Sequence, residues 1–565
     1  MIDEAHERNL NSDALLGIIK KIRRKRPNLR VVVCSATIDA RAFLDFFTSH
    51  NKKHPKSTEE NKTPPIRQKK RRWGRVGENT KEPQDVKIDL DEEDRDDGTI
   101  ISIDGRQHPV DIMHLSEPAS DYIRSSVEIA LKIHAEEDGG DILSFLPTGE
   151  DIDRAISISE ELLHSSSQSG TKKRAIFLPL YGSLPYQMQA RVFQPKPTSE
   201  RNSRRIIYAT NIAETSVTVP DITHVIDCGY SKIPFHDPKT GFDRLIVCPI
   251  SQASARQRSG RSGRVQPGKA YRLYTEQAML KTMEKATPPE VLRSNLTSFI
   301  LTLKALGVHN ILAFDLMDVP DVDAITHGLE CLYALGAIDD DTNLTSLGMD
   351  MSAFPTEPRV SRMLLESLKE GCAREILCVA SSMQMRSIIL RPRTQRQKID
   401  YDMVQGDIAD RSGDHVTYVD IMERQDESPM NEEECKESFL NYLALKRATE
   451  VRLQLARFLR RYGQVTGLSK VDVDDEERSK KIRKCVTSGF FFNVAKLGND
   501  GRYYTLRGKH LVTVSSSSVL HSHGDISEYI IFAETHDGTR GGIEVRSCST
   551  IDGRWLRELA PHYWA

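Results

Sequence analysis

The sequence has no long hydrophobic run. No stretch of about eighteen uncharged apolar residues occurs in its 565 residues, which argues against a membrane-spanning helix. Its start, Met1-Ile2-Asp3-Glu4, has neither the basic region nor the apolar region of a secretory signal. The nine cysteines are scattered and include no Cys-x-x-Cys pair. This pattern predicts reduced thiols inside a cell and argues against a zinc ribbon or an iron–sulfur cluster.

The sequence also lacks an excess of charge of either sign. Its 79 Lys and Arg nearly balance 81 Asp and Glu, giving a net charge of −2 and a pI near 6.8. A protein that coats nucleic acid non-specifically is normally basic overall. If this chain binds nucleic acid, we therefore expect a local, lined channel. A length of 565 residues is too great for one core and predicts roughly three to five domains.

Strand and helix patterns alternate at the start of the chain. Leu15, Leu16, Ile19 and Ile22 recur at helical spacing. Arg30 to Cys34 is typical of a short strand, and Ala40 to Phe47 of a second amphipathic helix.

Residues 50–98 break this alternation. Residues 51–75 hold ten Lys or Arg against two Glu, and residues 85–97 hold eight acids against two bases. Such a segment cannot bury enough apolar surface to offset its ordering entropy, so we predict a disordered charged insertion. Its run Lys69-Lys70-Arg71-Arg72 is compatible with a nuclear import signal or an RNA-touching patch. The alternative is a solvated insertion whose oppositely charged halves attract each other.

The remaining chain falls into three patterns. From 105 to 285, short apolar runs such as Ile142–Phe145, Ile206–Ala209 and His224–Asp227 alternate with helical stretches, which predicts βαβ units and a buried parallel sheet. Residues 286–465 are mostly helical and end in a long amphipathic stretch from Cys435 to Tyr462. From about Gly489 the short strands and Gly/Ser turns predict a small β-barrel.

Two adjacent acids stand in Asp3-Glu4-Ala5-His6, where a strand is expected to end. Open α/β sheets place ligands at this edge. Asp3 suits Mg²⁺ bound through water, and Glu4 suits orienting and deprotonating an attacking water. By itself the tetrapeptide is more typical of an acidic helix start.

A second cluster, Gln257-Arg258-Ser259-Gly260-Arg261-Ser262-Gly263-Arg264, carries three arginines. Arg261 and Arg264 are three residues apart and would share one face of a helical turn, where two guanidiniums suit the charge that develops on a departing γ-phosphate. Arg258 is the next candidate for this role. The glycines allow another backbone to approach closely. The alternative is a basic surface turn.

Between these clusters lies the polar stretch Ala209-Thr210-Asn211-Ile212-Ala213-Glu214-Thr215-Ser216-Val217-Thr218. Its hydroxyls, amide and exposed backbone N–H groups suit a sugar–phosphate track without base specificity. A helix cap followed by a polar turn is the alternative.

In this order the clusters resemble motifs II, III, V and VI of the superfamily 2 RNA helicases, DEAH/RHA branch, with Ser35-Ala36-Thr37 as motif III. Lesser matches agree with this, namely Phe145-Leu146-Pro147-Thr148-Gly149, Gly413-Asp414-His415, Phe439-Leu440-Asn441-Tyr442 and Leu559-Ala560-Pro561-His562-Tyr563. The resemblance covers the chain outside the charged insertion. Its subgroup is similar to DEAH-box helicase 35, a spliceosome-associated branch.

The resemblance implies α/β RecA-like lobes, the first partial, then winged-helix and helical ratchet domains and a C-terminal β-barrel, the OB-fold. The expected bounds are 1–104 for the first lobe with its insertion, 105–285 for the second lobe, 286–352 for the winged helix, 353–465 for the ratchet bundle and 466–565 for the OB-fold.

The resemblance also implies a role for each motif residue. Asp3 would serve Mg²⁺, Glu4 the attacking water and His6 the γ-phosphate of ATP, with Gln257, Arg261 and Arg264 completing catalysis. Ser35 and Thr37 would couple nucleotide state to lobe movement. Phe193, Ser216 and Thr218 would bind nucleotide, Thr210 and Asn211 would contact RNA, and residues 226–249 would form a strand-separating hairpin. The implied partners are single-stranded or duplex RNA, a glycine-patch protein and spliceosome components, in the nucleus, with no membrane.

The sequence departs from the family in one important respect. No Gly-x-x-x-x-Gly-Lys-Ser/Thr phosphate loop precedes Asp3, and Gly263 to Ala270 only mimics one, because Ala replaces the hydroxyl and a strand pattern follows. We therefore expect a chain that begins inside the first lobe and, alone, hydrolyses little ATP. The alternatives are a non-catalytic RNA- or partner-binding module and an iron–sulfur DNA helicase. The missing cysteine cluster disfavours the second of these. Pro220 is a smaller departure, since it cannot donate an N–H to a ligand.

Overall fold

The structure, a computed structural model, describes residues 1–26, 28–35, 40–48, 98–102, 108–137, 139–165, 174–182, 184, 186–196, 203–214, 219–385, 388–390, 392, 395–468, 474–522, 526–537 and 542–564. The chain divides into two compact units, one of Met1–Glu7 and Leu15–Gly105, the other of Arg8–Ala14 and Arg106–Ala565. The predicted disorder of residues 50–98 and the basic run 69–72 fall, apart from residue 98, outside the described residues. Within the described part, no helix is both long and apolar enough to cross a membrane.

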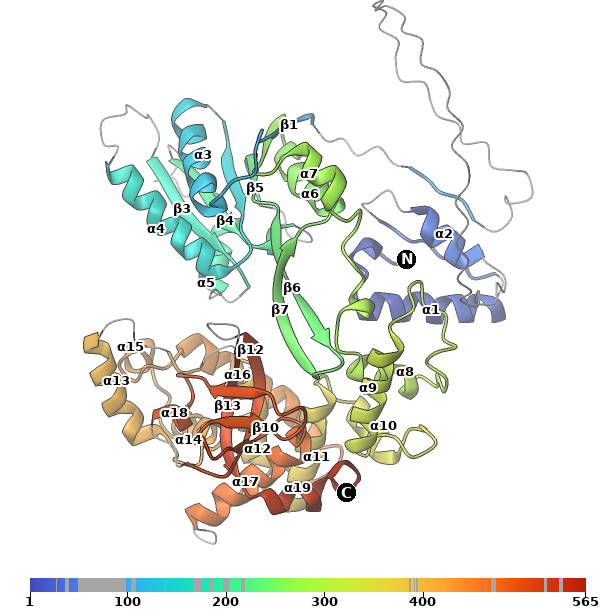
Figure 1. The fold of residues 1–565 in the computed structure, drawn as a ribbon, viewed down its shortest axis with the longest axis vertical. Coiled ribbons are helices and arrows are strands. Elements are labelled where there is room, and N and C mark those ends of the chain that lie inside the picture. Colours follow the sequence, from blue (N-terminus) through green and yellow to red (C-terminus); the bar gives the residue numbers. More distant parts are fainter. Residues whose placement is uncertain are drawn as a thin grey trace, which may run out of the picture. The chain divides into compact units, whose positions relative to one another are not determined.

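The first unit (blue in Figure 1) contains the 3₁₀ turn η1 (Ala5–Glu7), most of helix α1 (Leu10–Lys25) and helix α2 (Ala40–Thr48). The two predicted helices are confirmed. The predicted strand at 30–34 is reduced to one parallel bridge, Ile2 to Val33. The reason is local, since among the described residues only the segment at Ile2 pairs with it.

A six-stranded parallel sheet forms the first part of the second unit, as the buried apolar runs predict. Its order is β1-β8-β5-β2-β4-β3. The strands are β1 (Val110–His114), β2 (Asp141–Phe145), β3 (Arg174–Leu180), β4 (Ser203–Ala209), β5 (Ile222–Asp227) and β8 (Gly268–Arg272). Every residue of β2, β4 and β5 is buried, because helices cover both faces. Gly268–Arg272 being a strand agrees with rejecting a phosphate loop at 263–270.

Alternate residues of the central strands face two separate cores. Ile142, Ile206 and Tyr208 pack with α3 (Tyr122–Glu136) and α4 (Gly149–Ser165). Leu143 and Ile207 pack on the other face with α5 (Tyr186–Phe193). All six strands therefore end at one edge, between two helical layers, which is where this class of sheet holds ligands.

A two-stranded hairpin, β6 (Tyr230–Asp237) and β7 (Phe242–Pro249), extends from the sheet (Figure 1). The expectation that the hairpin begins at Ile226 is wrong, because Ile226 and Asp227 complete strand β5. At its far end Phe242 is 8% exposed and belongs to the core of the C-terminal barrel with Val512 and Phe532.

Helices fill the region from 276 to 459, as predicted. They are α7 (Glu276–Thr282), α8 (Thr297–Ala305), α9 (Val322–Ala334), α10 (Ser346–Ser352), α11 (Pro358–Glu370), α12 (Ala373–Met383), α13 (Gln395–Ile408), α14 (Asp414–Glu427), α15 (Glu432–Glu437) and α16 (Tyr442–Leu459), with a 3₁₀ turn, η6 (Glu290–Leu292), before α8. The single helix expected from Cys435 to Tyr462 is broken. Phe439 has a φ of 53°, and the Asn441 side chain caps α16 by accepting a hydrogen bond from Ala444 N.

The C-terminal segment forms the predicted small barrel, closed in the order β10-β11-β13-β12-β9. Its elements are α17 (Asp475–Phe490), β9 (Val494–Leu497), β10 (Tyr503–Thr505), β11 (Leu511–Val514), α18 (Val519–Ser522), β12 (Tyr529–Asp537), β13 (Ile543–Ile551), α19 (Gly553–Leu559) and α20 (Pro561–Trp564). One hydrophobic core runs from Val291 to Ala560 and joins the helices to the barrel. The helical and barrel segments are therefore packed as one body.

The junction between α14 and the barrel is made by Gly413-Asp414-His415. A Cβ on Gly413 would lie 2.4 Å from Cys548 O, so only glycine allows this approach. The Asp414 carboxylate accepts hydrogen bonds from Val519 N and Cys548 N, each at 2.7 Å. His415 is fully buried, with Nδ1 2.8 Å from Ser549 Oγ.

Acid should destabilise the fold through His415. Burial lowers the pKa of His415 from 6.5 to about 3. Between these values the unfolded chain binds the proton and the folded chain does not, so the free energy of unfolding falls as pH falls. His415 alone should contribute a slope of up to about 1.4 kcal/mol per pH unit, and neighbouring Asp414, whose pKa burial raises to about 6, contributes with the opposite sign. Urea denaturation from pH 7 to pH 4 measures it. His415→Asn, which keeps a polar atom near the Nδ1 position, should flatten the slope, whereas exposed His309→Asn should not. Equal slopes in all three proteins would contradict the assignment.

Candidate functional site

The acidic tetrapeptide lies at the end of the short paired segment of the first unit. Ala5 N donates to Cys34 O at 3.0 Å, which places Ser35 next to Asp3-Glu4-Ala5-His6. Asp3 and Glu4 are exposed, and Asp3 Oδ1 accepts a hydrogen bond from Glu4 N at 2.9 Å. Glu4 has a φ of 50°, a conformation that side-chain-bearing residues rarely adopt outside functional turns. His6 Nε2 lies 3.5 Å from Glu4 Oε2. The predicted partner Thr37 lies outside the described residues.

In the second unit, Thr210 and Asn211 follow directly on the carboxyl end of β4. Thr210 N donates to Leu180 O at 3.0 Å, which fixes the backbone beside β3. Asn211 begins the 3₁₀ turn η4 (Asn211–Ala213) and is exposed. These two residues therefore present polar groups at the ligand-binding edge of the sheet. Ser216 and Thr218, predicted for nucleotide binding, lie outside the described residues.

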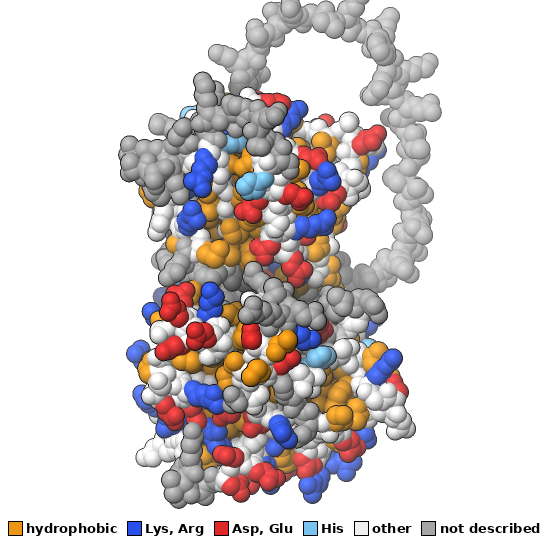
Figure 2. Space-filling model, turned by 90° about the vertical axis from the view of Figure 1, so that its left-hand side faces the viewer, with side chains coloured by type: hydrophobic (Ala, Val, Ile, Leu, Met, Phe, Trp, Pro, Cys, Tyr) orange, Lys and Arg blue, Asp and Glu red, His pale blue; other side chains and the backbone are white. Residues whose placement is uncertain are grey.

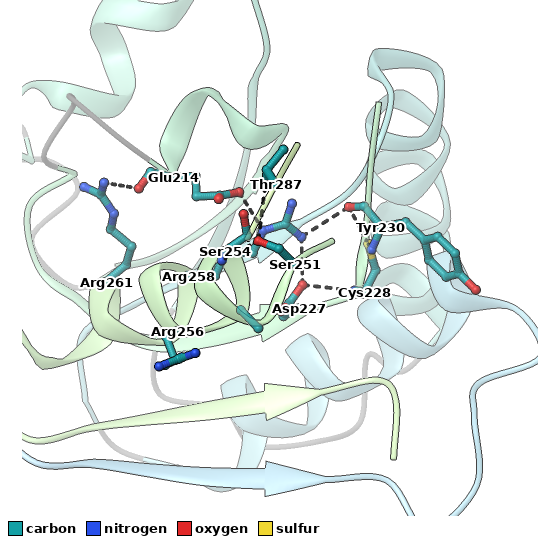
Figure 3. Close-up of polar contacts among 12 residues, drawn as sticks. Glu214, Asp227, Cys228, Tyr230, Ser251, Ser254, Arg256, Arg258, Arg261 and Thr287 are labelled. Carbon is teal, nitrogen blue, oxygen red and sulfur yellow. Dashed lines mark hydrogen bonds and ion pairs between the residues drawn. The ribbon is translucent and has the colours of Figure 1, made fainter. Parts of the chain in front are cut away.

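The arginine cluster begins in α6 (Gln252–Gly260), where a buried ion-pair network holds Arg258 (Figure 3). The Ser251 side chain caps this helix by accepting from Ser254 N. Arg258 Nε donates to Glu214 Oε2 at 3.0 Å, and its Nη1 donates to Asp227 Oδ1 at 2.8 Å. Its guanidinium also lies 4.8 Å from the centre of the Phe145 ring. Burial opposes the charge on Arg258, but Asp227 and Glu214 outweigh burial and raise its pKa.

Asp227 is itself fixed by two further donors. Tyr274 Oη donates to Asp227 Oδ2 at 2.8 Å, and Gly229 N donates to Oδ1 at 3.0 Å. The network therefore ties the ends of β5 and β8 to helix α6. Arg258 has both carboxylates as partners inside the protein, which gives it a structural role, and its role as the next candidate catalytic arginine stays a prediction.

Arg261 and Arg264 occupy the turn that follows α6. Arg261 starts the 3₁₀ turn η5 (Arg261–Gly263) and is buried, and its Nη2 donates to the backbone oxygen of Glu214 (Figure 3). Arg264 is exposed and Gln257 is half-buried. Glu214 thus connects the polar stretch after β4 with the arginine cluster. A Cβ on Gly263 would lie 2.7 Å from His108 O, which agrees with the expected close backbone approach.

Phe193 is the last residue of α5 and is partly buried. It packs against the core that contains Leu143 and Ile207. The structure therefore gives this ring a packing role, and a nucleotide-stacking role stays a prediction.

Glu214, Asp227 and Tyr274 are site residues that the sequence reasoning missed. An acid that ends a completely buried strand, as Asp227 does in β5, requires a buried cationic partner. This requirement is a pattern from which Asp227 could have been identified as a member of a buried ion pair. It does not identify Arg258 as the partner, because helix α6 is about thirty residues away in the chain.

Comparison with known proteins assigns most of the second unit to four domain families. Residues 125–266 match the helicase conserved C-terminal domain, and residues 328–356 match the winged-helix part of the helicase-associated HA2 domain. Residues 357–418 match the ratchet-like part of that domain, and residues 482–563 match the oligonucleotide/oligosaccharide-binding fold. The first of these ranges contains Arg258, Glu214 and Asp227, together with both polar clusters of the second lobe, while Tyr274 lies just beyond it.

Three curated relatives align with the whole chain. The chain is 38% identical over 565 residues to the probable ATP-dependent RNA helicase DHX35 of Pongo abelii and to that of Homo sapiens, covering 71% and 73% of their lengths. It is 36% identical over 567 residues to the probable ATP-dependent RNA helicase DHX35 homolog of Caenorhabditis elegans, covering 70% of that protein.

Proposed function

This chain belongs to the DEAH-box RNA helicases, in the group of DHX35, and we propose that it uses ATP hydrolysis to translocate on and remodel RNA. The observation that carries this proposal is the double attachment of Glu214. Its carboxylate binds Arg258 and its carbonyl binds Arg261, so the polar stretch that begins at Thr210 and the arginine turn are one connected structure. A change at the arginines therefore reaches the RNA-facing residues without an intervening hinge.

We propose that Asp3, Glu4 and His6 form the acidic part of the nucleotide site. The exposed Asp3 carboxylate fits Mg²⁺, which is commonly held by one or two carboxylates together with substrate phosphates. Among the described residues no group of three or more His, Cys, Asp or Glu forms a metal cage, which also fits Mg²⁺ better than a structural metal. Mg²⁺ would neutralise developing phosphate charge. Glu4 would orient and deprotonate water, and His6, close to Glu4, would contact the γ-phosphate.

The remaining nucleotide roles rest on the family. Gln257, Arg261 and Arg264 would stabilise charge on the transferred phosphate, Ser35 and Thr37 would couple nucleotide state to movement, and Phe193, Ser216 and Thr218 would bind nucleotide. Together these residues supply acid, base and arginine functions. The phosphate-binding loop of the family is not among the 565 residues.

For RNA, Thr210 and Asn211 would contact phosphate or sugar, which carries no sequence information. Figure 2 supports a local site, because Lys and Arg side chains are interspersed with Asp and Glu on the face shown and form no basic field. The hairpin β6–β7 exposes Leu245, Ile246 and Val247, apolar side chains suited to packing against an unstacked base. A role in pre-mRNA splicing in the nucleus, with a glycine-patch protein and spliceosome components, is the family-level part of the proposal.

Asn211→Ala should weaken binding of single-stranded RNA about ten-fold. Its exposed amide makes no hydrogen bond within the described residues and is available to a phosphate, and a hydrogen bond to a charged group contributes roughly 1.5–3 kcal/mol. Fluorescence anisotropy with a labelled oligouridine, at two salt concentrations, measures the affinity. Asn343→Ala removes an exposed amide elsewhere and should leave the affinity unchanged. Equal affinities of the wild type and Asn211→Ala would contradict the proposal that Asn211 contacts RNA.

A non-catalytic RNA- or partner-binding module is the second candidate. The features favouring it are the polar turn at Thr210 and Asn211 and the oligonucleotide-binding barrel at 482–563, since binding RNA through these parts requires no ATP hydrolysis. The two candidates differ in one measurement. Joining a first-lobe segment that carries the family's phosphate-binding loop should produce RNA-stimulated ATP hydrolysis if the chain's acidic and arginine residues are catalytic. A joined protein that folds and binds RNA but hydrolyses no ATP would favour the binding module.

A further inference from the structure

A cavity of about 270 Å³ lies at the far end of the β6–β7 hairpin. Four parts of the second unit line it, namely the hairpin turn at 238–242, helix α9, the start of α11, and the barrel with its C-terminal Tyr563. The hairpin turn at 238–242 belongs to the segment expected to separate RNA strands, but the residues proposed to bind nucleotide, and Thr210 and Asn211, do not line this cavity. The cavity is therefore separate from the proposed nucleotide site and from the polar turn after β4.

Two arginines in this cavity are held against aromatic rings. The Arg359 guanidinium lies 5.3 Å from the centre of the Phe492 ring, and its Nη1 donates to Asn493 Oδ1 at 3.4 Å. The Arg507 guanidinium lies 5.4 Å from the centre of the Tyr563 ring and donates to the Tyr563 hydroxyl at 3.1 Å. Stacking on a ring fixes a guanidinium plane while leaving its N–H edges available. Both guanidinium groups are therefore already oriented before a ligand binds.

The two arginines differ in their ionic partners. Arg507 lies 3.5 Å from the Glu330 carboxylate. Half-buried Arg359 has no carboxylate within ion-pair distance in the part of the chain that the structure describes. Glu357 attracts Arg359 from beyond ion-pair distance, so an anionic ligand would supply the directly contacting counter-ion that Arg359 lacks among the described residues. Lys239, on the hairpin turn, adds a third cation to the lining, and Asp323 adds a carboxylate at an exposed position.

The pKa of His327, beside the cavity, indicates the sign of the charge that surrounds it. Burial is the largest cause that lowers the pKa of His327 from 6.5 to about 4, and the neighbouring His236, Arg359 and Arg507 lower it further than Asp243 raises it. The His236 ring lies 5.1 Å from that of His327, and its buried Nε2 has no hydrogen-bond partner among the described residues. Positive charge thus outweighs negative charge at His327, although Asp323 and Glu330 also line the cavity.

We propose that this cavity binds a phosphate monoester, with Arg359 as its main contact and Arg507 and Lys239 as supporting cations. A guanidinium fork matches two phosphate oxygens, and such charge-assisted pairs are among the strong hydrogen bonds of proteins. The cavity is smaller than the roughly 300–1,000 Å³ of drug-sized ligand sites, which fits a phosphate with one sugar. The same chemistry occurs on a free sugar phosphate and on the 5′-phosphorylated end of an RNA. The proposal does not depend on catalysis by this chain.

The test uses the full 565-residue chain and three probes, namely ribose 5-phosphate, a 5′-phosphorylated oligouridine and the same oligouridine with a 5′-hydroxyl. Isothermal titration calorimetry measures ribose 5-phosphate, and anisotropy measures the oligonucleotides. Arg359→Gln should weaken binding of ribose 5-phosphate about ten-fold, the effect of losing one charge-assisted contact. Lys239→Gln should weaken it by a smaller factor. Because Lys239 is exposed, that variant remains informative even where Arg359→Gln disturbs folding.

Lys369→Gln is the matched control, because this residue is 67% exposed on the same helix as Arg359 and does not line the cavity. It should bind every probe like the wild type. If the 5′-phosphate strengthens oligonucleotide binding and the Arg359 variant loses that gain, the phosphate comes from an RNA end. If ribose 5-phosphate alone responds to the variants, a free sugar phosphate is the ligand. Failure of the wild type to bind ribose 5-phosphate and to distinguish the two oligonucleotides overturns the proposal, as does equal binding by wild type and both cavity variants.

Discussion

Arg261→Ala should lower RNA-stimulated ATP hydrolysis on the order of 10³-fold, in a form of the chain joined to a first-lobe segment that carries the family's phosphate-binding loop. Arg261 is buried at the end of α6, and its guanidinium is held by the backbone oxygen of Glu214. An arginine positioned in advance acts on charge that develops only in the transition state, so its loss should reduce kcat far more than it raises KM. Steady-state kinetics with saturating RNA measure both constants.

Arg256→Ala provides the comparison for that experiment. Arg256 is exposed on the same helix, and its Nε donates a hydrogen bond to the backbone oxygen of Gln252 at 3.2 Å. Its removal should change kcat less than about two-fold, as surface changes away from the chemistry do. Arg264→Ala should also slow the reaction, and the double variant should lose less than the product of the two single effects. Normal turnover by Arg261→Ala would remove this residue from the catalytic set.

Arg258→Leu should destabilise the second lobe by roughly 3–5 kcal/mol, the range observed when one partner of a buried ion pair is removed. The replacement leaves the Asp227 and Glu214 carboxylates without their shared cation, and both are buried. Tyr274 and Gly229 still donate to Asp227, so the largest loss should fall on Glu214. Chemical denaturation followed by circular dichroism measures the free energy of unfolding.

A second substitution separates charge from packing in this network. Adding Glu214→Gln and Asp227→Asn to Arg258→Leu removes the unpaired negative charges and should recover part of the lost stability. Arg256→Leu, an arginine loss on the exposed side of α6, should cost less than about 0.5 kcal/mol. Arg258→Leu with wild-type stability would mean that the ion pairs contribute nothing to the fold.

Much of the fold could be predicted because its elements carry local patterns. The central strands are short runs rich in apolar residues, and the barrel strands are short runs separated by turn residues, so both were predicted close to their observed bounds. The errors occur where a backbone conformation depends on distant contacts. The stretch from Cys435 to Tyr462 keeps helical periodicity through Phe439, but the chain turns there, with Leu390 N donating to Phe439 O.

The site divides in the same way. The positions of Asp3-Glu4-Ala5-His6, Thr210 and the arginine turn followed from short motifs, and the structure shows that each lies at the end of a strand or helix. The distinction between Arg258 and Arg261 did not follow, because both are arginines in one turn-rich segment. Only the three-dimensional arrangement shows that two carboxylates engage Arg258 and that a backbone oxygen engages Arg261.

Phe242 anchors the end of the hairpin in the barrel. Its ring lies inside the barrel with Val512 and Phe532, although its strand grows from the sheet of the second lobe. Thr535 of the barrel also donates to Asp243 O, at 3.5 Å. Moving the sheet away from the barrel would expose the Phe242 side chain to water, and this exposure would cost roughly 1.5–3 kcal/mol. The hairpin therefore connects the sheet of the second lobe directly to the core of the barrel. Any separation of the sheet from the barrel therefore has to break the contacts of Phe242 with Val512 and Phe532.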